Sequence, residues 1–119
     1  MLFLRRHLKP DQCSDDPNIL ESYSVDETGV YKSIPCAVVF PESTDDVSLI
    51  LKYCNEHKIS VTPRGAGTGL AANSVPDTGG LLMIFSRMSK ILRIDSQNGI
   101  VTVQPGCIVD VLKQEVRKE

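Results

Sequence analysis

The sequence contains no apolar run near the length that crosses a lipid bilayer, about 20 residues. We therefore expect a cytoplasmic protein whose membrane contact, if it has any, is peripheral or made through a partner. The first ten residues do not resemble a secretory signal, because a short apolar stretch precedes Arg5 and Arg6, whereas a signal places its charge first. These residues are expected to form a terminal helix or strand.

A concentrated basic face is also missing. The 13 Lys and Arg residues are scattered and are outnumbered by 15 Asp and Glu, which leaves a formal net charge of -2. Nucleic-acid binding requires clustered positive charge, so no nucleic-acid partner is expected. The length of 119 residues and the hydrophobic fraction of 41% are typical of one globular domain.

The four cysteines form no CxxC pair, and no histidine stands at zinc-ligand spacing from them, so the sequence predicts no metal site. Cys36 and Cys54 stand in apolar stretches, where a reduced cysteine behaves as a small hydrophobic side chain, and we expect both to be buried. A catalytic thiolate would need a neighbouring base or helix N-terminus, and the sequence identifies neither.

The chain divides into an N-terminal arm, residues 1–32, and the main part of a domain, residues 33–119. The arm is expected to be irregular from residue 11 onward, because Pro17 and Gly29 interrupt a polar stretch without periodicity.

Three short apolar runs in the main part predict buried strands, at residues 37–40, 59–62 and 81–85. A helix is expected between the first two strands, because Ser43 and Asp46 resemble a capping box. Residues at helical spacing follow: Val47, Ile50, Leu51 and Cys54. This succession favours a right-handed βαβ unit with parallel strands.

The last third of the chain predicts a hairpin and a helix. Isoleucines and valines flank a turn at residues 95–99 that contains Asn98-Gly99, as expected for an antiparallel hairpin. From Ile108, apolar residues recur at helical spacing to Val116. No Gly or Asn cap follows this helix, so the chain is expected to be part of a longer protein.

The loop of residues 63–70, PRGAGTGL, is the segment most typical of a ligand-binding site. Its alternating glycines permit positive φ angles and let a ligand approach the backbone without meeting a Cβ atom. Successive inward amides form an anion-binding nest, to which the Thr68 hydroxyl and the Arg64 charge can add, so the loop suits a pyrophosphate. The sequence contains no GxxxxGK[ST] phosphate loop, and the dinucleotide motif GxGxxG does not fit because position 70 is Leu where the motif has Gly. A plain tight turn and a site for a simple phosphate or nucleotide remain alternatives.

The wider context favours a cofactor. The segments PCAVVFP, PRGAGTGL, SRMSKILRID and VQPG occur in an order that resembles the FAD-linked oxidases of the vanillyl-alcohol oxidase superfamily, whose flavin domain is called PCMH-type. YSVD at 23–26 and PES at 41–43 are most similar to glycolate oxidase flavin subunits and D-lactate dehydrogenases. The resemblance implies an α+β fold, the first half of a PCMH-type domain: a small parallel βαβ sheet over residues 35–86, then the start of an antiparallel sheet over 90–106.

The resemblance also implies a cofactor site and an activity. The FAD pyrophosphate is expected on the loop backbone, with Pro63 and Ser74 lining the pocket and Gly106 close to the cofactor; the loop residues are Arg64, Gly65, Ala66, Gly67, Thr68 and Gly69. Some members attach flavin through a loop histidine; Thr68 stands at that position here, so non-covalent FAD is expected. The parent protein would oxidise a small 2-hydroxy acid such as glycolate or D-lactate, with FAD accepting a hydride.

The alternative is a truncated, non-catalytic fragment that folds without holding flavin tightly. In the resembled family a second Gly-rich stretch and a substrate domain follow, and neither occurs in these 119 residues, so no catalytic residue is predicted. Half a pyrophosphate site makes few contacts to offset an association cost of about 4 kcal/mol or more, so weak FAD binding is expected. Unpaired sheet edges would let two copies associate, and a homodimer is a further expectation.

Overall fold

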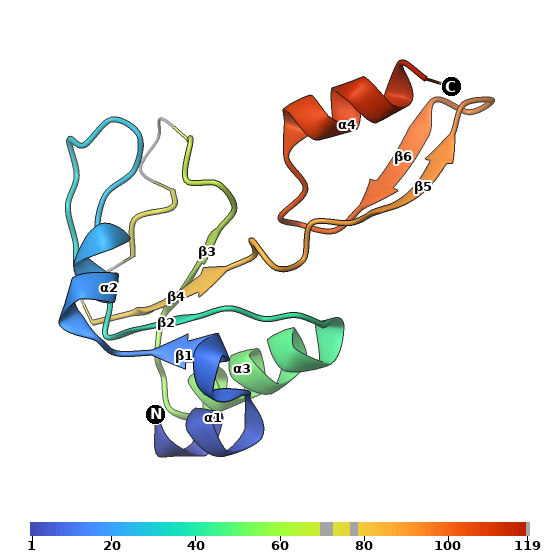
Figure 1. The fold of residues 1–119 in the computed structure, drawn as a ribbon. Helices are drawn as coiled ribbons and strands as arrows, with labels where there is room; N and C mark the ends of the chain where they lie inside the picture. The colour runs from blue at the N-terminus through green and yellow to red at the C-terminus, as the bar shows by residue number, and fades with distance from the viewer. Residues whose placement is uncertain (70–72, 77–78, 119) are drawn as a thin grey trace.

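The computed structural model describes residues 1–69, 73–76 and 79–118, so Leu70, the last residue of the predicted loop, lies outside the described part. Figure 1 shows the arrangement of the elements. In chain order they are α1 (Leu2–His7), the 3-10 helix η1 (Pro10–Gln12), β1 (Cys13–Ser14), α2 (Pro17–Ser22), β2 (Ala37–Val39), α3 (Thr44–Glu56), β3 (Val61–Arg64), β4 (Leu81–Ile84), β5 (Ile91–Asp95), β6 (Ile100–Val103) and α4 (Val109–Val116).

The main sheet has four strands in the order β1-β2-β4-β3. β4 is parallel to both of its neighbours, and Leu82 pairs with Val38 on one side and with Thr62 on the other. The predicted α+β fold with parallel strands is therefore confirmed, but β2 and β3 are not adjacent as the simplest βαβ unit would have them. All residues of β2 and β4 are buried, and these two apolar strands take the two interior positions of the sheet.

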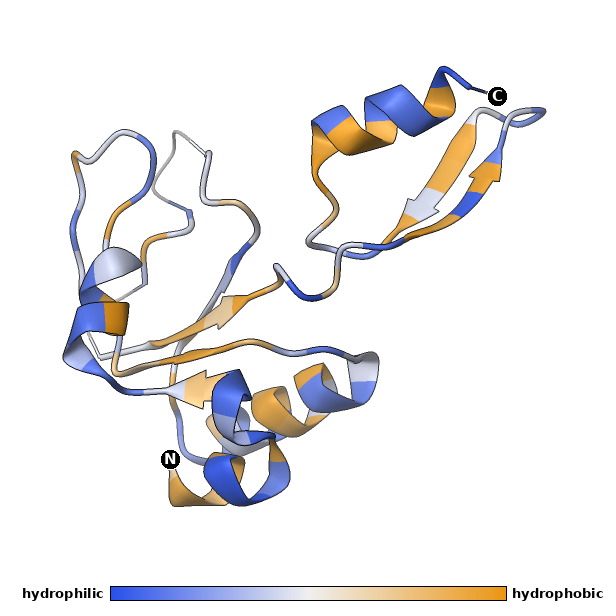
Figure 2. Cartoon of the chain, viewed as in Figure 1, coloured by the Kyte–Doolittle hydropathy of each residue, from blue (hydrophilic) through white to orange (hydrophobic). Residues whose placement is uncertain are grey.

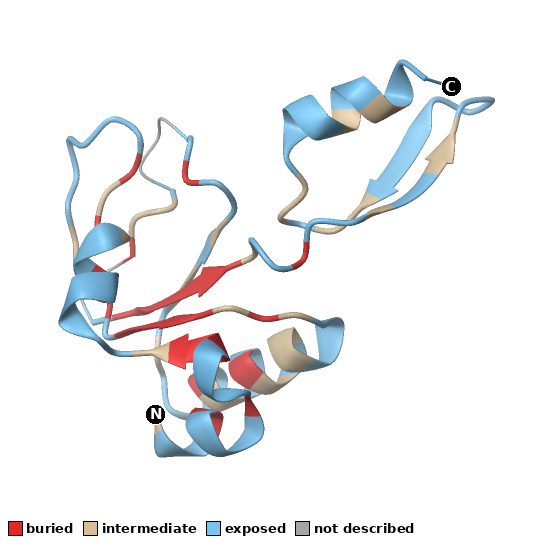
Figure 3. Cartoon of the chain, viewed as in Figure 1, coloured by how far each residue is buried: buried red, intermediate tan, exposed pale blue. Residues whose placement is uncertain are grey.

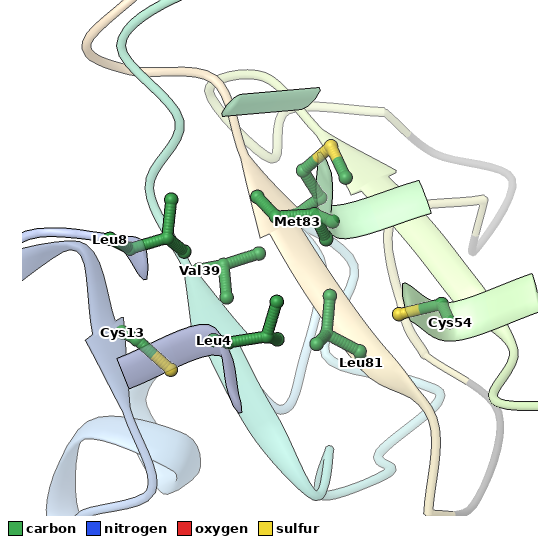
Figure 4. Packing of buried hydrophobic residues seen from close by; sticks show 8 residues of the cluster. Leu4, Leu8, Cys13, Val39, Cys54, Leu81 and Met83 are labelled. Carbon is green, nitrogen blue, oxygen red and sulfur yellow. The ribbon is translucent and has the colours of Figure 1, made fainter. Parts of the chain in front are cut away.

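The core lies on both faces of this sheet. On one face α1 and α3 cover a cluster formed by Leu4, Leu8, Cys13, Val39, Ile50, Cys54, Leu81 and Met83. Figure 4 shows the side chains of the N-terminal segment meeting those of β2, β4 and α3. On the other face Val38 and Leu82 pack with Leu20 of α2. Successive residues of a strand point to opposite faces, which explains why Val38 and Val39 belong to different clusters.

The helix α3 begins where the sequence predicts. The Ser43 hydroxyl accepts a hydrogen bond from the Asp46 amide at 3.2 Å, and the Asp46 carboxylate accepts from the Glu42 amide at 2.9 Å and the Gln12 side chain at 2.8 Å. Burial acts to raise the pKa of Asp46, but these hydrogen bonds hold it below its ordinary value. Leu51 was predicted to belong to the apolar stripe that packs on the sheet, and this was wrong: its side chain is 46% exposed, at the side of the contact.

Two further expectations were wrong. The arm is not irregular from residue 11 onward, since η1, β1 and α2 form there and Leu20 enters a core cluster, whereas the terminal helix or strand expected for the first ten residues is present as α1. Cys36 is exposed, whereas Cys54 is buried as expected. Cys36 precedes the first residue of β2, where no side chain of the core covers it. Burial raises the pKa of the Cys54 thiol, and so does the nearby Cys36.

The C-terminal part forms a second, two-stranded sheet with one helix. β5 and β6 pair antiparallel, as predicted, and Gly99 in their turn has a φ of +65°. α4 follows at the predicted place, but none of its residues is buried. Figures 2 and 3 show α4 and the hairpin apart from the main sheet, with stretches coloured hydrophobic in Figure 2 and no residue of either element coloured buried in Figure 3. No helix in the described part is long and apolar enough to cross a membrane.

Candidate ligand-binding site

The glycine loop, residues 65–69, leaves the main sheet at the carboxyl end of β3. Arg64 ends the strand opposite Ile84, and its carbonyl accepts a hydrogen bond from the Phe85 amide at 2.9 Å. The carboxyl ends of parallel strands are where open α/β sheets bind ligands. Within the loop only Gly67 has a positive φ, +75°, and it is buried. The predicted need for left-handed backbone therefore applies to Gly67.

A cavity of about 330 Å³ separates the loop from a segment far along the chain. One wall is Gly65, Ala66 and Thr68, and the other is the pre-helix segment, residues 105–110. A smaller cavity of about 210 Å³ shares part of both walls and adds the hydroxyls of Ser86 and Ser89. The larger cavity, of about 330 Å³, falls at the lower end of the range for ligand pockets, about 300–1,000 Å³.

Gly65 stands at the centre of the first wall. A Cβ atom built on it would have the Pro105 carbonyl oxygen, at 4.0 Å, as its nearest neighbour. Pro105 belongs to the opposite wall, so a side chain at position 65 would project across the cavity and not into the protein. The absent side chain at Gly65 therefore leaves backbone accessible to a ligand, as the sequence predicts for this loop.

The first turn of α4 forms part of the second wall. Its N-cap is Ile108, which provides no side-chain hydrogen bond to the helix amides. Unpaired amides and the positive end of the helix dipole favour an anion there. The Asp110 carboxylate lies in the same turn, but its side chain is 86% exposed and Lys113 is 3.8 Å away. Solvent and this cation reduce its repulsion of a bound phosphate.

Gly106 connects the two parts of the molecule. Its amide donates to the Met88 carbonyl at 2.8 Å, and a Cβ atom there would lie 1.8 Å from the Phe85 carbonyl oxygen. No side chain fits, because two backbone segments cross at this point. Gly106 lines both cavities, as expected of a residue near the cofactor, but this backbone crossing requires glycine independently of any ligand.

Ser74 presents an unpaired group. Its hydroxyl oxygen is buried and has no hydrogen-bond partner among the residues that the structure describes. Buried polar atoms in native proteins are almost always paired, so this hydroxyl is a group that a ligand could pair. Neither cavity is lined by Ser74, Pro63 or Gly69, so the structure unites only part of the predicted set: Gly65, Ala66, Thr68 and Gly106.

Apart from Gly106, which the resemblance placed close to the cofactor, the sequence did not reveal the pre-helix segment as a wall of the site. The helix that reaches the loop is not the next element along the chain but α4, and only the fold brings it there. The turn signal Pro105-Gly106, followed at Ile108 by an apolar helical pattern, was the available clue.

Another groove, of about 360 Å³, lies between α1 and α3. The carboxylates of Asp45 and Glu56 line it together with Lys52, and no glycine contributes to it. Two carboxylates repel a phosphate, so this groove does not suit the same ligand. Among the described residues no cluster of three or more His, Cys, Asp or Glu side chains could hold a metal ion.

The model of the FAD binding domain family matches residues 35–119, which include β2, β3 and β4 of the main sheet, the glycine loop and the pre-helix segment. The chain belongs to this family. The predicted relationship to FAD-linked oxidases with a PCMH-type domain is thereby confirmed. The match covers both walls of the cavity but not α1, β1 or α2.

Curated relatives of this FAD binding domain are named as a subunit of glycolate oxidase and as dehydrogenases of D-lactate and D-2-hydroxyglutarate. The chain is 48% identical over 86 residues to the glycolate oxidase subunit GlcD of Bacillus subtilis, a match covering 72% of the chain and 18% of that protein. It is 36% identical over 115 residues to a D-lactate dehydrogenase of Anaerostipes hadrus, covering 96% of the chain and 24% of that protein. The chain is also 36% identical over 107 residues to the mitochondrial D-2-hydroxyglutarate dehydrogenase of Danio rerio, a match covering 90% of the chain and 20% of that protein. The chain thus spans a quarter or less of these relatives.

Solved structures share the fold at low identity. An alkyldihydroxyacetonephosphate synthase superposes with a TM-score of 0.83 at 20% identity, covering 98% of the chain and 24% of that structure. p-Cresol methylhydroxylase superposes with a TM-score of 0.81 at 24% identity, covering 97% and 23%. The arrangement of both sheets in this FAD binding domain therefore occurs in larger proteins.

Proposed function

We propose that the cavity between the glycine loop and the pre-helix segment holds the pyrophosphate of FAD. The observation that carries the proposal is the pair of facing walls: Gly65 exposes backbone on one side, and the uncapped first turn of α4 presents amides on the other. Thr68 offers a further hydroxyl donor on the cavity wall. Ser74 lines neither cavity, so its hydroxyl would serve a part of the cofactor that extends beyond them. The conformation of the loop would depend on Pro63, Arg64, Gly67 and Gly69. Gly106 would keep the pre-helix segment close to this loop.

The flavin would be held without a covalent bond. Thr68 is exposed at the cavity, and its hydroxyl can donate a hydrogen bond to a phosphate but has no imidazole to attach the flavin ring. Few side chains of this chain surround the cavity, so binding by the 119 residues alone is weak. Denaturation in acid or detergent should release all of the flavin, and yellow colour that stays with the protein would contradict this point.

The parent activity proposed here is oxidation of a 2-hydroxy acid of the glycolate or D-lactate class. The names of the relatives support it, including one that acts on D-2-hydroxyglutarate. FAD would accept the hydride when bound, and this part of the chain would supply its anchoring. We propose that the groups that remove the substrate proton belong to the parts of the relatives that this chain does not span.

The test introduces side chains at Gly65. Gly65→Ala and Gly65→Val place one and three carbon atoms in the cavity without meeting protein atoms closer than 4.0 Å at the Cβ position. We expect the affinity for FAD, measured by quenching of flavin fluorescence, to fall at least tenfold for Gly65→Val, about 1.4 kcal/mol. The thermal midpoint without FAD should stay within about 2 °C of the wild type.

A matched control is Gly99→Ala, in the turn between β5 and β6. Gly99 also lies apart from other atoms, and its φ of +65° makes alanine mildly unfavourable for folding. This variant should lose some stability but keep its affinity for FAD. If Gly65→Val binds FAD as the wild type does, the pyrophosphate does not occupy this cavity.

The second candidate is a fragment that folds and associates without holding flavin tightly. The exposed apolar side chains of the C-terminal part favour it, with Val109 59% exposed and Ile100 58% exposed. Such surfaces are covered in stable proteins, by another part of a chain or by another copy. Sedimentation at two protein concentrations, with and without FAD, separates the candidates: a dimer that is indifferent to saturating FAD would support the second.

A further inference from the structure

The Arg64 guanidinium lies between the glycine loop and a segment some forty residues earlier in the chain. Its Nη1 donates to the Val25 carbonyl oxygen at 2.7 Å and approaches that of Tyr23 at 3.4 Å. The guanidinium carbon is 5.5 Å from the centre of the Tyr23 ring. A carbonyl pair and an aromatic face together form a receptor suited to a planar cation.

The other side of the guanidinium faces Gly67. A Cβ atom on Gly67 would lie 2.3 Å from Nη2 and 2.6 Å from Nε of Arg64, so the loop folds directly over this group. Gly67 is the loop residue with positive φ, and the guanidinium occupies the space beneath that turn. The side chain of Arg64 therefore contacts the loop from behind, and neither of the two cavities is lined by Arg64.

The receptor for Arg64 is itself well ordered by local contacts. Ser24 is 1% exposed, and its hydroxyl donates to the Glu21 carbonyl at 2.7 Å. The Tyr23 ring packs edge-on against Phe40 with centroids 6.1 Å apart. Val25 forms a bridge with Lys32. Segment 23–25 is thus a fixed support and not a solvated loop that moves with the arginine.

We infer that Arg64 is a positioning residue: it fixes the conformation of the glycine loop by anchoring it to segment 23–25, and it contacts no phosphate. This inference extends the proposed function. Of its two tests, only the second, on FAD affinity, rests on that proposed function. It also gives the N-terminal segment, which lies outside the matched family region, a direct influence on the FAD site. The sequence had suggested the opposite role for this side chain, a positive charge placed beside the phosphate.

The first test needs no flavin. Amide hydrogen exchange is measured for residues 23–25 and 65–69 in the wild type, Arg64→Lys and Tyr23→Leu, with folding verified by circular dichroism. Lysine keeps the charge but cannot bond two carbonyls while lying flat on the ring. We expect both variants to accelerate exchange about tenfold in both segments, and not in β4. Arg64→Lys weakens the charged hydrogen bonds to the two carbonyls, and Tyr23→Leu keeps those carbonyls but removes the aromatic face beside the guanidinium.

Arg93→Lys is the matched control for this exchange experiment. Arg93 lies in β5 with its side chain 72% exposed, and it pairs only locally, with Asp95 at 2.9 Å. It should leave exchange in both segments unchanged. Unchanged exchange of residues 65–69 in a folded Arg64→Lys variant would overturn the inference, whether or not the protein binds FAD.

The second test is a double-mutant cycle on FAD affinity with Arg64→Lys, Tyr23→Leu and the double variant. If Arg64 acts through segment 23–25, each single variant weakens FAD binding and the double variant is no weaker than the worse single one. If Arg64 contacts phosphate, lysine retains affinity while Arg64→Met loses it, and the effect of Arg64→Met adds to that of Tyr23→Leu. That second pattern would overturn the inference. Absence of FAD binding by the folded wild type would refute the proposed function, and the exchange test would still decide the role of Arg64.

Discussion

Replacement of Gly106 by alanine tests whether the two parts of the molecule meet as described. The added Cβ atom would lie 1.8 Å from the Phe85 oxygen, 2.7 Å from the Phe85 carbonyl carbon and 2.9 Å from the Met88 oxygen. All three are backbone atoms, which cannot rotate away as the end of a side chain can. The Gly106 segment or the Phe85–Met88 turn must therefore move by more than an ångström.

The energetic cost follows from two contributions. Overpacking of this kind costs about 1–3 kcal/mol, and the movement also breaks the hydrogen bond from the Gly106 amide to the Met88 carbonyl, 2.8 Å long, for about 1 kcal/mol more. A total of about 3 kcal/mol is a large share of the 5–15 kcal/mol typical of a folded domain. For a chain of this length it corresponds to a fall in the thermal midpoint of roughly 10 °C.

The assay is thermal unfolding followed by circular dichroism, together with amide exchange of residues 88–106. Gly65→Ala serves as the control, because its nearest neighbour at the Cβ position is 4.0 Å away and the midpoint should hardly change. We expect Gly106→Ala to melt well below both the wild type and Gly65→Ala, with the largest increase in exchange around Met88. Equal midpoints for the two glycine variants would refute the close backbone crossing, and with it the position of the second cavity wall.

Three further predictions concern acid stability, thiols and association. The pKa of Asp46 is below its ordinary value of 3.8, so its contribution to stability is complete above pH 3.8 and is lost as the pH falls through the folded-state pKa. Asp46→Asn should cost about 1 kcal/mol at pH 7. Urea unfolding at a series of acidic pH values should show a smaller fall of the unfolding free energy with pH for this variant, and an unchanged pH dependence would contradict the prediction. A maleimide should modify Cys36 rapidly and Cys54 only on unfolding, as mass spectrometry of peptides would show, and equal rates would contradict their burial. If copies associate through α4, Val109→Asp should shift the sedimentation profile toward monomer, whereas an unaffected profile would exclude that face.

Local signals predicted the elements whose causes are local. α3 begins at a serine cap and continues in an apolar period, and the hairpin turns at a glycine that adopts positive φ. The strand order could not be obtained this way. β4 lies between β2 and β3, and this order depends on how all the strands pair with one another and not on the pattern of β4 alone.

The candidate site shows the same limit. The glycine loop was predictable because glycines at alternate positions are a property of the chain itself. Of the opposing wall only Gly106 was expected, from the family resemblance; the rest of the pre-helix segment reaches the loop through the backbone crossing at Gly106, which local sequence does not show. The direction of the Arg64 side chain was also beyond prediction, because its acceptors are backbone carbonyls of Tyr23 and Val25, and a carbonyl carries no signature in a sequence. The expected division at residue 32, between arm and domain, remains a prediction.

The measurement that most directly tests the pyrophosphate site compares FAD with riboflavin, which has the same ring system but no phosphate. The 119-residue chain is heated in the presence of each ligand at equal concentration, in excess. A ligand present at ten times its dissociation constant raises the unfolding free energy by about 1.4 kcal/mol, a shift of several degrees. We expect FAD to raise the thermal midpoint of the wild type, riboflavin to leave it unchanged, and Gly65→Val to lose the response to FAD. Equal shifts with FAD and riboflavin, or no shift with FAD in a chain shown to be folded, would contradict a pyrophosphate site between the glycine loop and α4.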